Sequence, residues 1–378
     1  MIYFDNNSTT AVAPECRQAM LECMQSGPLN PSSKHAQGER AKHYLMTARA
    51  QVAQLLGALP PEVVFTSSGT EANHMAILGA LALQPQRRHI ISSEVEHPAT
   101  LMLLRHLQTQ GVRVTYLPVD HAGRLNLEAL ADTLTADTAL VSLMWVNNET
   151  GVLFPIASAA QMVRQHGALF HTDAVQAVGK LPINLQQLPV DLLSLSAHKL
   201  HAPGGVGALY VRKGIKLPPL LFGSQERGRR AGTENLPGIV ALGVACAMLQ
   251  QNMATQIAHT EQLRQRLEVG VLAAIPCASI NGAAAARLSN TSNIRFGDLD
   301  AELILGRLDR LGIYASAGAA CSSAGTKPSH VLTAMGLSPA AALASVRFSL
   351  DAHNTVDEVD VLLGVLPDML RELAQLSA

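Results

Sequence analysis

The sequence of 378 residues contains few charged residues and no excess of either sign, and this excludes several classes of protein. Charged residues make up 15% of the chain, hydrophobic residues make up 48%, and the formal net charge is -1. Because no basic stripe and no block of like charge is present, we expect no nucleic-acid partner and no charged interaction tail. The composition predicts a folded chain with a large core rather than a disordered one.

Sequence signals for export and for membrane insertion are also missing. The first ten residues, MIYFDNNSTT, contain neither a basic segment nor an apolar run, so we expect no secretory signal and a cytoplasmic location. A long uncharged run covers residues 236–258, but its second half contains glutamine and asparagine. Its apolar part is too short to cross a bilayer, and we therefore expect a buried core helix and no membrane partner.

The five cysteines form no CxxC pair, which argues against zinc-ribbon and thioredoxin-type sites. An odd number of cysteines in a chain without an export signal indicates free thiols. Cys16, Cys23, Cys246 and Cys277 lie in helical or apolar contexts, where we expect core packing. Cys321 lies among Ala, Ser and Gly residues that cannot anchor a loop by burial, so we expect that loop to be mobile. Its thiol is either inert or a group that carries sulfur into a site and out again.

The first two thirds of the chain alternate apolar strands with helical patterns. Continuous apolar runs predict a mostly parallel sheet with helices on both faces, over residues 14–255. The seven expected strands are at 62–66, 89–92, 112–119, 139–146, 168–172, 192–196 and 207–211. The helices expected among them are at 70–83, 98–109, 127–134 and 155–165.

A different pattern follows and predicts a smaller α+β domain made of residues 1–13 and 256–378, which carries the Cys321 loop. The helices expected in it are at 261–274, 301–311 and 356–376, and the strands are near 293–296 and at 346–350.

Polar residues follow five successive strands of the predicted sheet, at the ends where open α/β sheets bind ligands. These tips are 67–71, His97, 147–151, 172–176 and 196–199. Taken singly, each has an ordinary explanation, such as a helix N-cap, a solvated histidine or a surface lysine. Together they predict one site that holds a phosphate, an acid, a stacking ring and a lysine. The sequence contains no GxxxxGK[ST] motif, which argues against a P-loop.

This combination of groups suits pyridoxal phosphate. The Lys199 amine can form an imine with the aldehyde of the cofactor, and a carboxylate against the pyridine nitrogen keeps the ring an electron sink. The N-terminus of the helix after 67–71 suits the phosphate. Arg347 lies inside an apolar strand and therefore needs an anion, either an internal acid or a substrate carboxylate.

With these residues collected, the chain resembles the pyridoxal-phosphate-dependent cysteine desulfurases, most closely the NifS type within the NifS/IscS group. The likeness covers nearly the whole chain. It is carried by the ordered matches YFDNNSTT, NPSSKH, TSSGTEAN, EHPA, MWVNNETG, HTDAVQAVGK, SLSAHKLHAP, QERGRRAGTEN, ACSSAG, PSHV and VRFSL.

The resemblance implies an α/β protein of PLP fold-type I that forms a homodimer with its active sites near the subunit interface. Lys199 would bind the cofactor covalently and Asp173 would pair with the pyridinium nitrogen. Gln176 would contact the phenolic oxygen of the ring, and His97 would stack on the ring and move protons. The remaining cofactor contacts implied are Asn148 and the phosphate ligands Gly69, Thr70, Ser196, His198 and, from the other subunit, Thr233.

The resemblance also implies the substrate, L-cysteine, and a path for its sulfur. Asn148 and Arg347 would receive the substrate carboxylate, with Asn30 assisting. Cys321 would attack the substrate sulfur and become a persulfide, leaving alanine. The persulfide would pass to an Fe–S scaffold or another sulfur-acceptor protein, with nitrogenase assembly favoured by the NifS likeness; an Fe–S cluster bound through Cys321 in the transfer complex is a further alternative. No metal site is expected.

Three alternative functions stay open. A selenocysteine lyase or another class-V enzyme would not need a nucleophilic Cys321. A housekeeping IscS-like enzyme would supply sulfur for tRNA thiolation. A non-catalytic sulfur carrier would need Cys321 but not Lys199.

Overall fold

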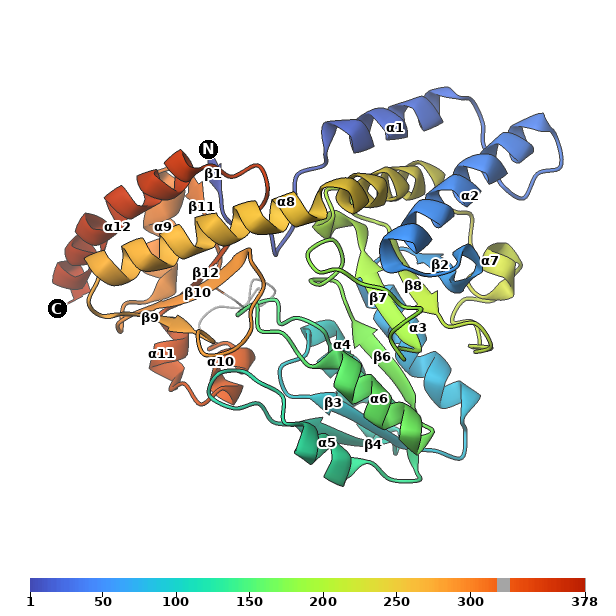
Figure 1. The fold of residues 1–378 in the computed structure, drawn as a ribbon, viewed down its shortest axis with the longest axis horizontal. Helices are drawn as coiled ribbons and strands as arrows, with labels where there is room; N and C mark the ends of the chain where they lie inside the picture. Colours follow the sequence, from blue (N-terminus) through green and yellow to red (C-terminus); the bar gives the residue numbers. More distant parts are fainter. Residues whose placement is uncertain (318–326, 378) are drawn as a thin grey trace.

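The computed structural model describes residues 1–317 and 327–377 and shows two packed regions joined by one long helix (Figure 1). The larger region is built around a seven-stranded sheet whose strand order is β2-β8-β7-β6-β5-β3-β4. The strands are β2 (Val63–Thr66), β3 (His89–Ser93), β4 (Arg113–Leu117), β5 (Thr138–Met144), β6 (Leu169–Asp173), β7 (Leu192–Ser196) and β8 (Gly207–Val211). All seven predicted strands are confirmed.

The sheet is mostly parallel, as predicted, with one reversed strand. Strands β4, β3, β5, β6 and β7 pair in parallel, whereas β8 pairs antiparallel with both β7 and β2. The reversal follows from the link between β7 and β8, which is too short for a crossover helix and therefore returns the chain as a hairpin. Strands β2, β3, β5, β7 and β8 are buried along their whole length, which explains their continuous apolar sequences.

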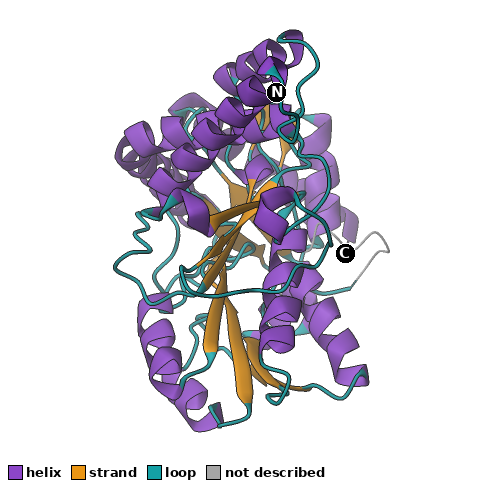
Figure 2. Ribbon diagram, turned by 90° about the vertical axis from the view of Figure 1, so that its right-hand side faces the viewer, coloured by secondary structure: helices purple, strands orange, loops and turns teal. Residues whose placement is uncertain are grey.

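Helices cover both faces of this sheet (Figure 2). The four that follow β2 to β5 are α3 (Gly69–Leu83), α4 (Pro98–Thr109), α5 (Leu127–Thr133) and α6 (Ile156–His166), within two residues of the predicted bounds. The starts of α3, α4 and α5 are set by the side chains of Ser68, His97 and Asn126, which accept N–H groups of the first turn. In this larger region, the elements without a sequence prediction are α1 (Pro14–Gln25), α2 (Ala36–Leu56), α7 (Gln225–Gly228) and the 3-10 turns η1 (Pro60–Glu62) and η2 (Ala197–Lys199).

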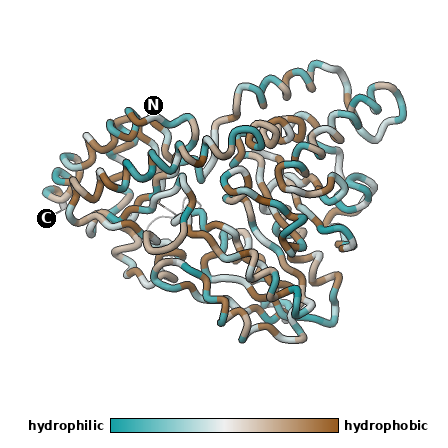
Figure 3. Tube along the Cα trace, viewed as in Figure 1, coloured by the Kyte–Doolittle hydropathy of each residue, from teal (hydrophilic) through white to brown (hydrophobic). Residues whose placement is uncertain are grey.

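Helix α8 (Leu236–Ala274) runs continuously for 39 residues across both regions. The sequence predicted two helices, at 236–258 and 261–274, and this was wrong because no glycine or proline interrupts the chain between them. The first half of α8 is mostly hydrophobic and the second half is mixed (Figure 3). Helix α8 alone, among the described residues, is long and apolar enough to cross a membrane, but 56% of its apolar window is buried inside the protein. That burial is what a core helix shows, as predicted.

The smaller region packs a three-stranded antiparallel sheet, order β12-β10-β9, against helices. Its strands are β9 (Ala278–Asn281), β10 (Thr291–Phe296) and β12 (Ser345–Ser349), and its helices are α9 (Ala301–Arg310), α10 (His330–Ala334), α11 (Pro339–Leu343) and α12 (Val356–Ser377). The chain start joins this region, since β1 (Ile2–Tyr3) pairs in parallel with β11 (Ile313–Tyr314). Phe4 belongs to the same buried apolar cluster as residues of α8, α9, β12 and α12.

The cysteines were predicted to be core residues in four cases, and three are. Cys16, Cys23 and Cys246 are buried free thiols. Cys277 is exposed, so its prediction was wrong; it lies in the turn between α8 and β9, where the apolar run that suggested burial ends. Cys321 and most of the loop predicted to be mobile lie outside the described residues.

Candidate active site

A cavity of about 610 Å³ opens where β2, β3, β5, β6 and β7 end, and this volume suits a cofactor-sized ligand. Ten of the predicted site residues line it: Gly69, Thr70, His97, Asn148, Asp173, Gln176, Ser196, His198, Lys199 and Arg347. Asn30 and Thr233 do not line it and are exposed. Cys321 lies outside the described part of the chain, although Lys327 and Pro328, a few residues further on, line the cavity.

Lys199 lies in the turn η2, three residues after the end of β7. Its Nζ donates to the backbone carbonyls of Asn7 and Ser8, so the N-terminal segment lies against the lysine. That segment is itself anchored, because the Asn7 side chain donates to Thr291 Oγ1 at 2.9 Å. The amine is therefore held on the cavity wall by a segment far from it in sequence.

Asp173 is the last residue of β6 and is only 8% exposed. Its two oxygens each accept one hydrogen bond, from Asn73 Nδ2 at 2.6 Å and from the Val175 N–H at 3.0 Å. These two donors hold the carboxylate in one orientation at the cavity. Asn73 lies one turn into α3, so its own position depends on the helix that follows β2.

Two histidines at the cavity are kept neutral at neutral pH. Burial lowers the pKa of His97, against the opposing charge of Asp173. Its Nδ1 accepts the Ala99 N–H at 3.2 Å, so the ring proton is on Nε2. Burial, followed by the charges of Lys199 and Lys180, lowers the pKa of His198 to about 4.

The turn before α3 forms a cradle for an anion. A Cβ added to Gly69 would come within 2.9 Å of Val175 Cγ2 and 3.3 Å of Ser196 Cβ, so only glycine lets the helix N-terminus approach this closely. The first N–H groups of an α-helix have no partner within the helix, and the helix dipole favours negative charge there. Ser196 and His198 line the cavity beside this turn.

Arg347, on β12, is 2% exposed and has the anionic partner that the sequence required. One terminal nitrogen donates to Asp5 Oδ1 at 2.6 Å and the other to the Asn148 carbonyl at 3.1 Å. Its Nε has no hydrogen-bond partner among the described residues. A buried donor without a partner is costly, so this atom favours a ligand oxygen at the cavity.

Sequence reasoning missed several groups that hold this site. Asn73 and Asp5 orient Asp173 and Arg347, and both lie inside matched motifs, TSSGTEAN and YFDNNSTT. Lys180 donates to Gln176 Oε1 at 2.8 Å while Gln176 donates to the Asn7 carbonyl at 2.9 Å. Burial, with the nearby charges of Lys199 and Arg347, lowers the pKa of Lys180 to about 7. Lys180 likewise ends a matched motif, HTDAVQAVGK, but its burial beside Lys199 and Arg347 depends on the whole fold.

Glu96 is buried directly before His97, and burial raises its pKa to about 8. One oxygen accepts from Ser93 Oγ at 2.6 Å and from the Met144 N–H at 3.0 Å, and the other has no partner among the described residues. The folded chain therefore keeps Glu96 protonated at neutral pH. The unfolded chain exposes Glu96, which then ionises near pH 4.5, whereas the folded chain holds its proton up to about pH 8. Protonated Glu96 therefore stabilises the fold fully below about pH 4.5, and this stabilisation is lost as the pH rises through about 8.

We expect Glu96→Gln to flatten this pH dependence, since glutamine mimics the protonated acid and cannot ionise. Between about pH 5 and 8 the variant should lose less stability than the parent, by the order of a few kcal/mol. Thermal unfolding at a series of pH values measures this, with Glu94→Gln as the control at an exposed neighbouring position. If the unfolding temperature changes equally with pH in the parent and in Glu96→Gln, Glu96 is not the buried acid that sets this pH dependence.

Comparison with known proteins gives a consistent result. The model of the family described as Aminotransferase class-V matches residues 2–362. A protein named cysteine desulfurase from Trichormus azollae is 49% identical over 378 residues, covering 100% of this chain and 94% of the relative. Cysteine desulfurase NifS of Azotobacter vinelandii is 48% identical, with the same coverage. A solved structure described as a NifS-like protein superposes with a TM-score of 0.92 at 36% identity, covering 98% of this chain and 100% of that one.

Proposed function

We infer that this chain, which belongs to the aminotransferase class-V family, is a cysteine desulfurase of the NifS type that converts L-cysteine to L-alanine. The observation that carries this conclusion is the convergence of Lys199, Asp173, His97 and Arg347 on one cavity. The groups needed to bind a carbonyl cofactor and an amino acid are therefore within reach of one another. Release of alanine from L-cysteine by the cofactor-loaded enzyme, with sulfide set free from the persulfide by an added thiol reductant, tests the function, and no alanine would overturn it.

Pyridoxal phosphate fits the groups around the cavity, and when bound it supplies an electron sink for breaking bonds at the substrate. Lys199 would hold its aldehyde carbon and Asp173 its pyridine nitrogen. The N-terminus of α3 at Gly69 and Thr70 would receive the phosphate, together with Ser196 and His198. Gln176 uses one of its two amide protons on Asn7, and the other is available for the phenolic oxygen.

His97 and Lys199 are the groups we propose to move protons. A neutral imidazole accepts a proton at neutral pH, and the lowered pKa of His97 provides that form. His97 reaches the cavity from the loop after β3 and Lys199 from the turn after β7, so the two bases lie on different loops. Asn148 also lines the cavity, and its carbonyl accepts from Arg347, so it would contact both the cofactor and the substrate.

Arg347 is the proposed partner of the substrate carboxylate, which would accept from the Nε–H on the edge of the guanidinium. Asn30, which is exposed and away from the cavity, would assist only after a movement of its loop.

We expect Arg347→Lys to raise the KM for L-cysteine about ten- to a hundredfold, because lysine keeps the charge but loses the planar donor set. The effect on kcat should be smaller, since the carboxylate is bound in the ground state as well. Steady-state rates of alanine release measure both constants. Arg310→Lys, on the exposed end of α9, is the matched control. An unchanged KM in Arg347→Lys would remove this residue from the substrate site.

The sulfur is proposed to leave on Cys321. The Sγ–Cβ bond of the substrate breaks, a bond forms between that sulfur and Cys321 Sγ, and the proton of the thiol is accounted for by the new C–H bond of alanine. Substrate and enzyme thiol thus give alanine and a persulfide without any outside oxidant. The persulfide would pass, in the cytoplasm, to an Fe–S scaffold or another acceptor; a role in nitrogenase assembly is one version of this proposal.

A homodimer completes the proposed phosphate site. Thr233 is exposed and does not line the cavity of its own chain, so it would act on the cavity of the partner subunit. The segment before it also exposes apolar side chains: Leu220 is 36%, Leu221 43% and Phe222 85% exposed. Burial of these side chains against a second copy would favour association.

The division into a large domain, residues 14–255, and a small domain, residues 1–13 and 256–378, is kept as part of the proposal. It is supported by two separate apolar clusters, one around the seven-stranded sheet and one containing Phe4, Phe296 and Phe348. The boundary at residue 255 lies inside helix α8, so this helix would connect the domains rigidly.

A further inference from the structure

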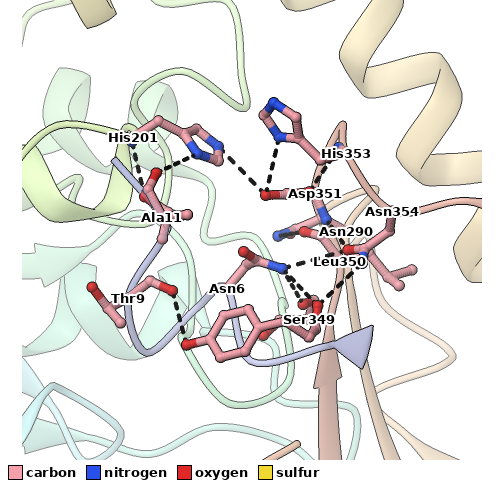
Figure 4. Close-up of polar contacts among 12 residues, drawn as sticks. Asn6, Thr9, Ala11, His201, Asn290, Ser349, Leu350, Asp351, His353 and Asn354 are labelled. Carbon is pink, nitrogen blue, oxygen red and sulfur yellow. Dashed lines mark hydrogen bonds and ion pairs between the residues drawn. The ribbon is translucent and has the colours of Figure 1, made fainter. Parts of the chain in front are cut away.

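We propose that His201, Asp351 and His353 form a binding site for a divalent transition-metal ion of the zinc type, outside the catalytic cavity. Figure 4 shows the two imidazole rings and the carboxylate of Asp351 turned toward one another. Their ligand atoms all lie within 4.8 Å of one another, and no other such group occurs among the described residues. The sequence predicted no metal site, because His201 is 150 positions away from Asp351 and no local pattern joins them.

Two of the three distances between ligand atoms in this cluster are close to those of a tetrahedral zinc site. Asp351 Oδ2 lies 3.7 Å from His201 Nε2 and 3.5 Å from His353 Nδ1. Zinc bonds to nitrogen and oxygen are about 2.0–2.1 Å long, which places neighbouring ligands of a tetrahedron about 3.3 Å apart. Movements of a few tenths of an ångström at these two pairs would therefore bring the atoms to their positions around an ion.

In His201 and Asp351, the atom that would not contact the ion already has a hydrogen-bond partner in the protein. His201 Nδ1 lies 3.1 Å from the carbonyl oxygen of Ala11, which can only accept, so Nδ1 carries the ring proton and Nε2 keeps its lone pair. Asp351 Oδ1 accepts the His353 N–H at 2.7 Å, which leaves Oδ2 facing the two rings. A second layer of partners that fixes the tautomer and orientation of the ligands is a regular feature of metal sites.

The backbone at His201 supports a specific role for this side chain. Its φ is +60°, one of three positive values outside glycine among the described residues. Its N–H donates to Thr10 Oγ1 at 2.9 Å, so the N-terminal segment holds this conformation and directs the ring toward Asp351. Such conformations persist only where surrounding contacts enforce them.

The site is accessible and lies between the two catalytic segments. The His353 side chain is 71% exposed, whereas those of His201 and Asp351 are 19% and 15% exposed, so an ion can enter from solvent. Three protein ligands leave a fourth position for water.

His201 comes two residues after Lys199, and Asp351 comes four residues after Arg347. A bound ion would therefore link the segment that carries the lysine to the segment that carries the arginine.

The test is zinc binding by the cofactor-loaded enzyme carrying Cys321→Ser, which removes a competing thiol. Titration with ZnCl₂ against a chromophoric chelator should show one zinc per chain, and the added variant His353→Ala should bind at least about tenfold more weakly. His166→Ala, at an exposed histidine on α6, should bind as the parent does. Cobalt(II) should give visible d–d bands in the parent and in His166→Ala but not in His353→Ala.

Protein stability provides a second readout that does not depend on the chelator. Zinc should raise the unfolding temperature of the parent and of His166→Ala but not that of His353→Ala, since ligands that bind only the folded state stabilise it. Because His353 is exposed, its replacement should leave the unfolding temperature without zinc unchanged, and Asp351→Asn provides an independent variant. Zinc that is not bound, or is bound equally by parent and His353→Ala, overturns the proposal.

Discussion

Replacing Lys199 with alanine should lower the rate of alanine formation from L-cysteine by at least about a thousandfold, because the chain loses both its covalent link to the cofactor and a base. The visible absorption that arises from the bond between the lysine and the cofactor should disappear as well. Lys199 Nζ also donates to the Asn7 and Ser8 carbonyls, so a loss of activity alone could reflect a displaced N-terminal segment. The spectrum and the rate must therefore be measured together.

Two further variants separate the chemical role of Lys199 from its structural one. Lys199→Arg keeps a cation and hydrogen-bond donors for those carbonyls but cannot form the imine, so it should be folded and inactive. Lys216→Ala, at an exposed lysine in the loop after β8, should retain both the spectrum and the rate. A visible band that survives in Lys199→Ala, or normal turnover by Lys199→Arg, would contradict the assignment of the lysine and with it the proposed mechanism.

The strand ends were the most predictable part of the site. Buried parallel strands such as β5 and β7 have continuous apolar sequences, and the polar residues that follow them must lie at one edge of the sheet. Asp173 and Lys199 therefore line the same cavity, as predicted. Their chemical roles needed the further resemblance to a known family, because a strand-end carboxylate or lysine has no unique function.

Other parts could not be predicted because they depend on contacts between distant segments. The order of the strands in the sheet follows from pairing partners that no local pattern specifies. Helix α2 alternates small, polar and charged residues and is defined mainly by its packing against α8. Asp5 binds Arg347 and Asn7 binds Lys199 across more than 190 positions, so only the folded chain shows that the first residues support both catalytic segments.

The buried cysteines limit which thiol can accept the sulfur. Burial raises the pKa of Cys16 to about 11 and raises that of Cys23 and Cys246 as well, so these thiols are almost entirely protonated at neutral pH. The thiolate is the nucleophilic form, and a protonated, enclosed thiol does not attack a substrate. Among the four cysteines that the structure describes, only Cys277 is exposed, and it lies in the turn after α8, away from the residues that line the cavity. Cys321 is thus left as the candidate, and Cys277 is its natural control.

We expect Cys321→Ser to keep the visible absorption of the bound cofactor and to lower the formation of alanine, sulfide and enzyme persulfide from L-cysteine by at least about a thousandfold, because a hydroxyl is a poor acceptor of sulfur. Cys277→Ser should keep the rate within about twofold, since an exposed residue outside the site has little effect. Mass spectrometry of the enzyme after reaction with L-cysteine locates the added sulfur atom. Normal turnover by Cys321→Ser would exclude the persulfide route and favour a lyase that releases its product without an enzyme thiol. Loss of the cofactor spectrum in the same variant would instead mean that Cys321 supports the cofactor site, and the role of sulfur acceptor would have to be withdrawn.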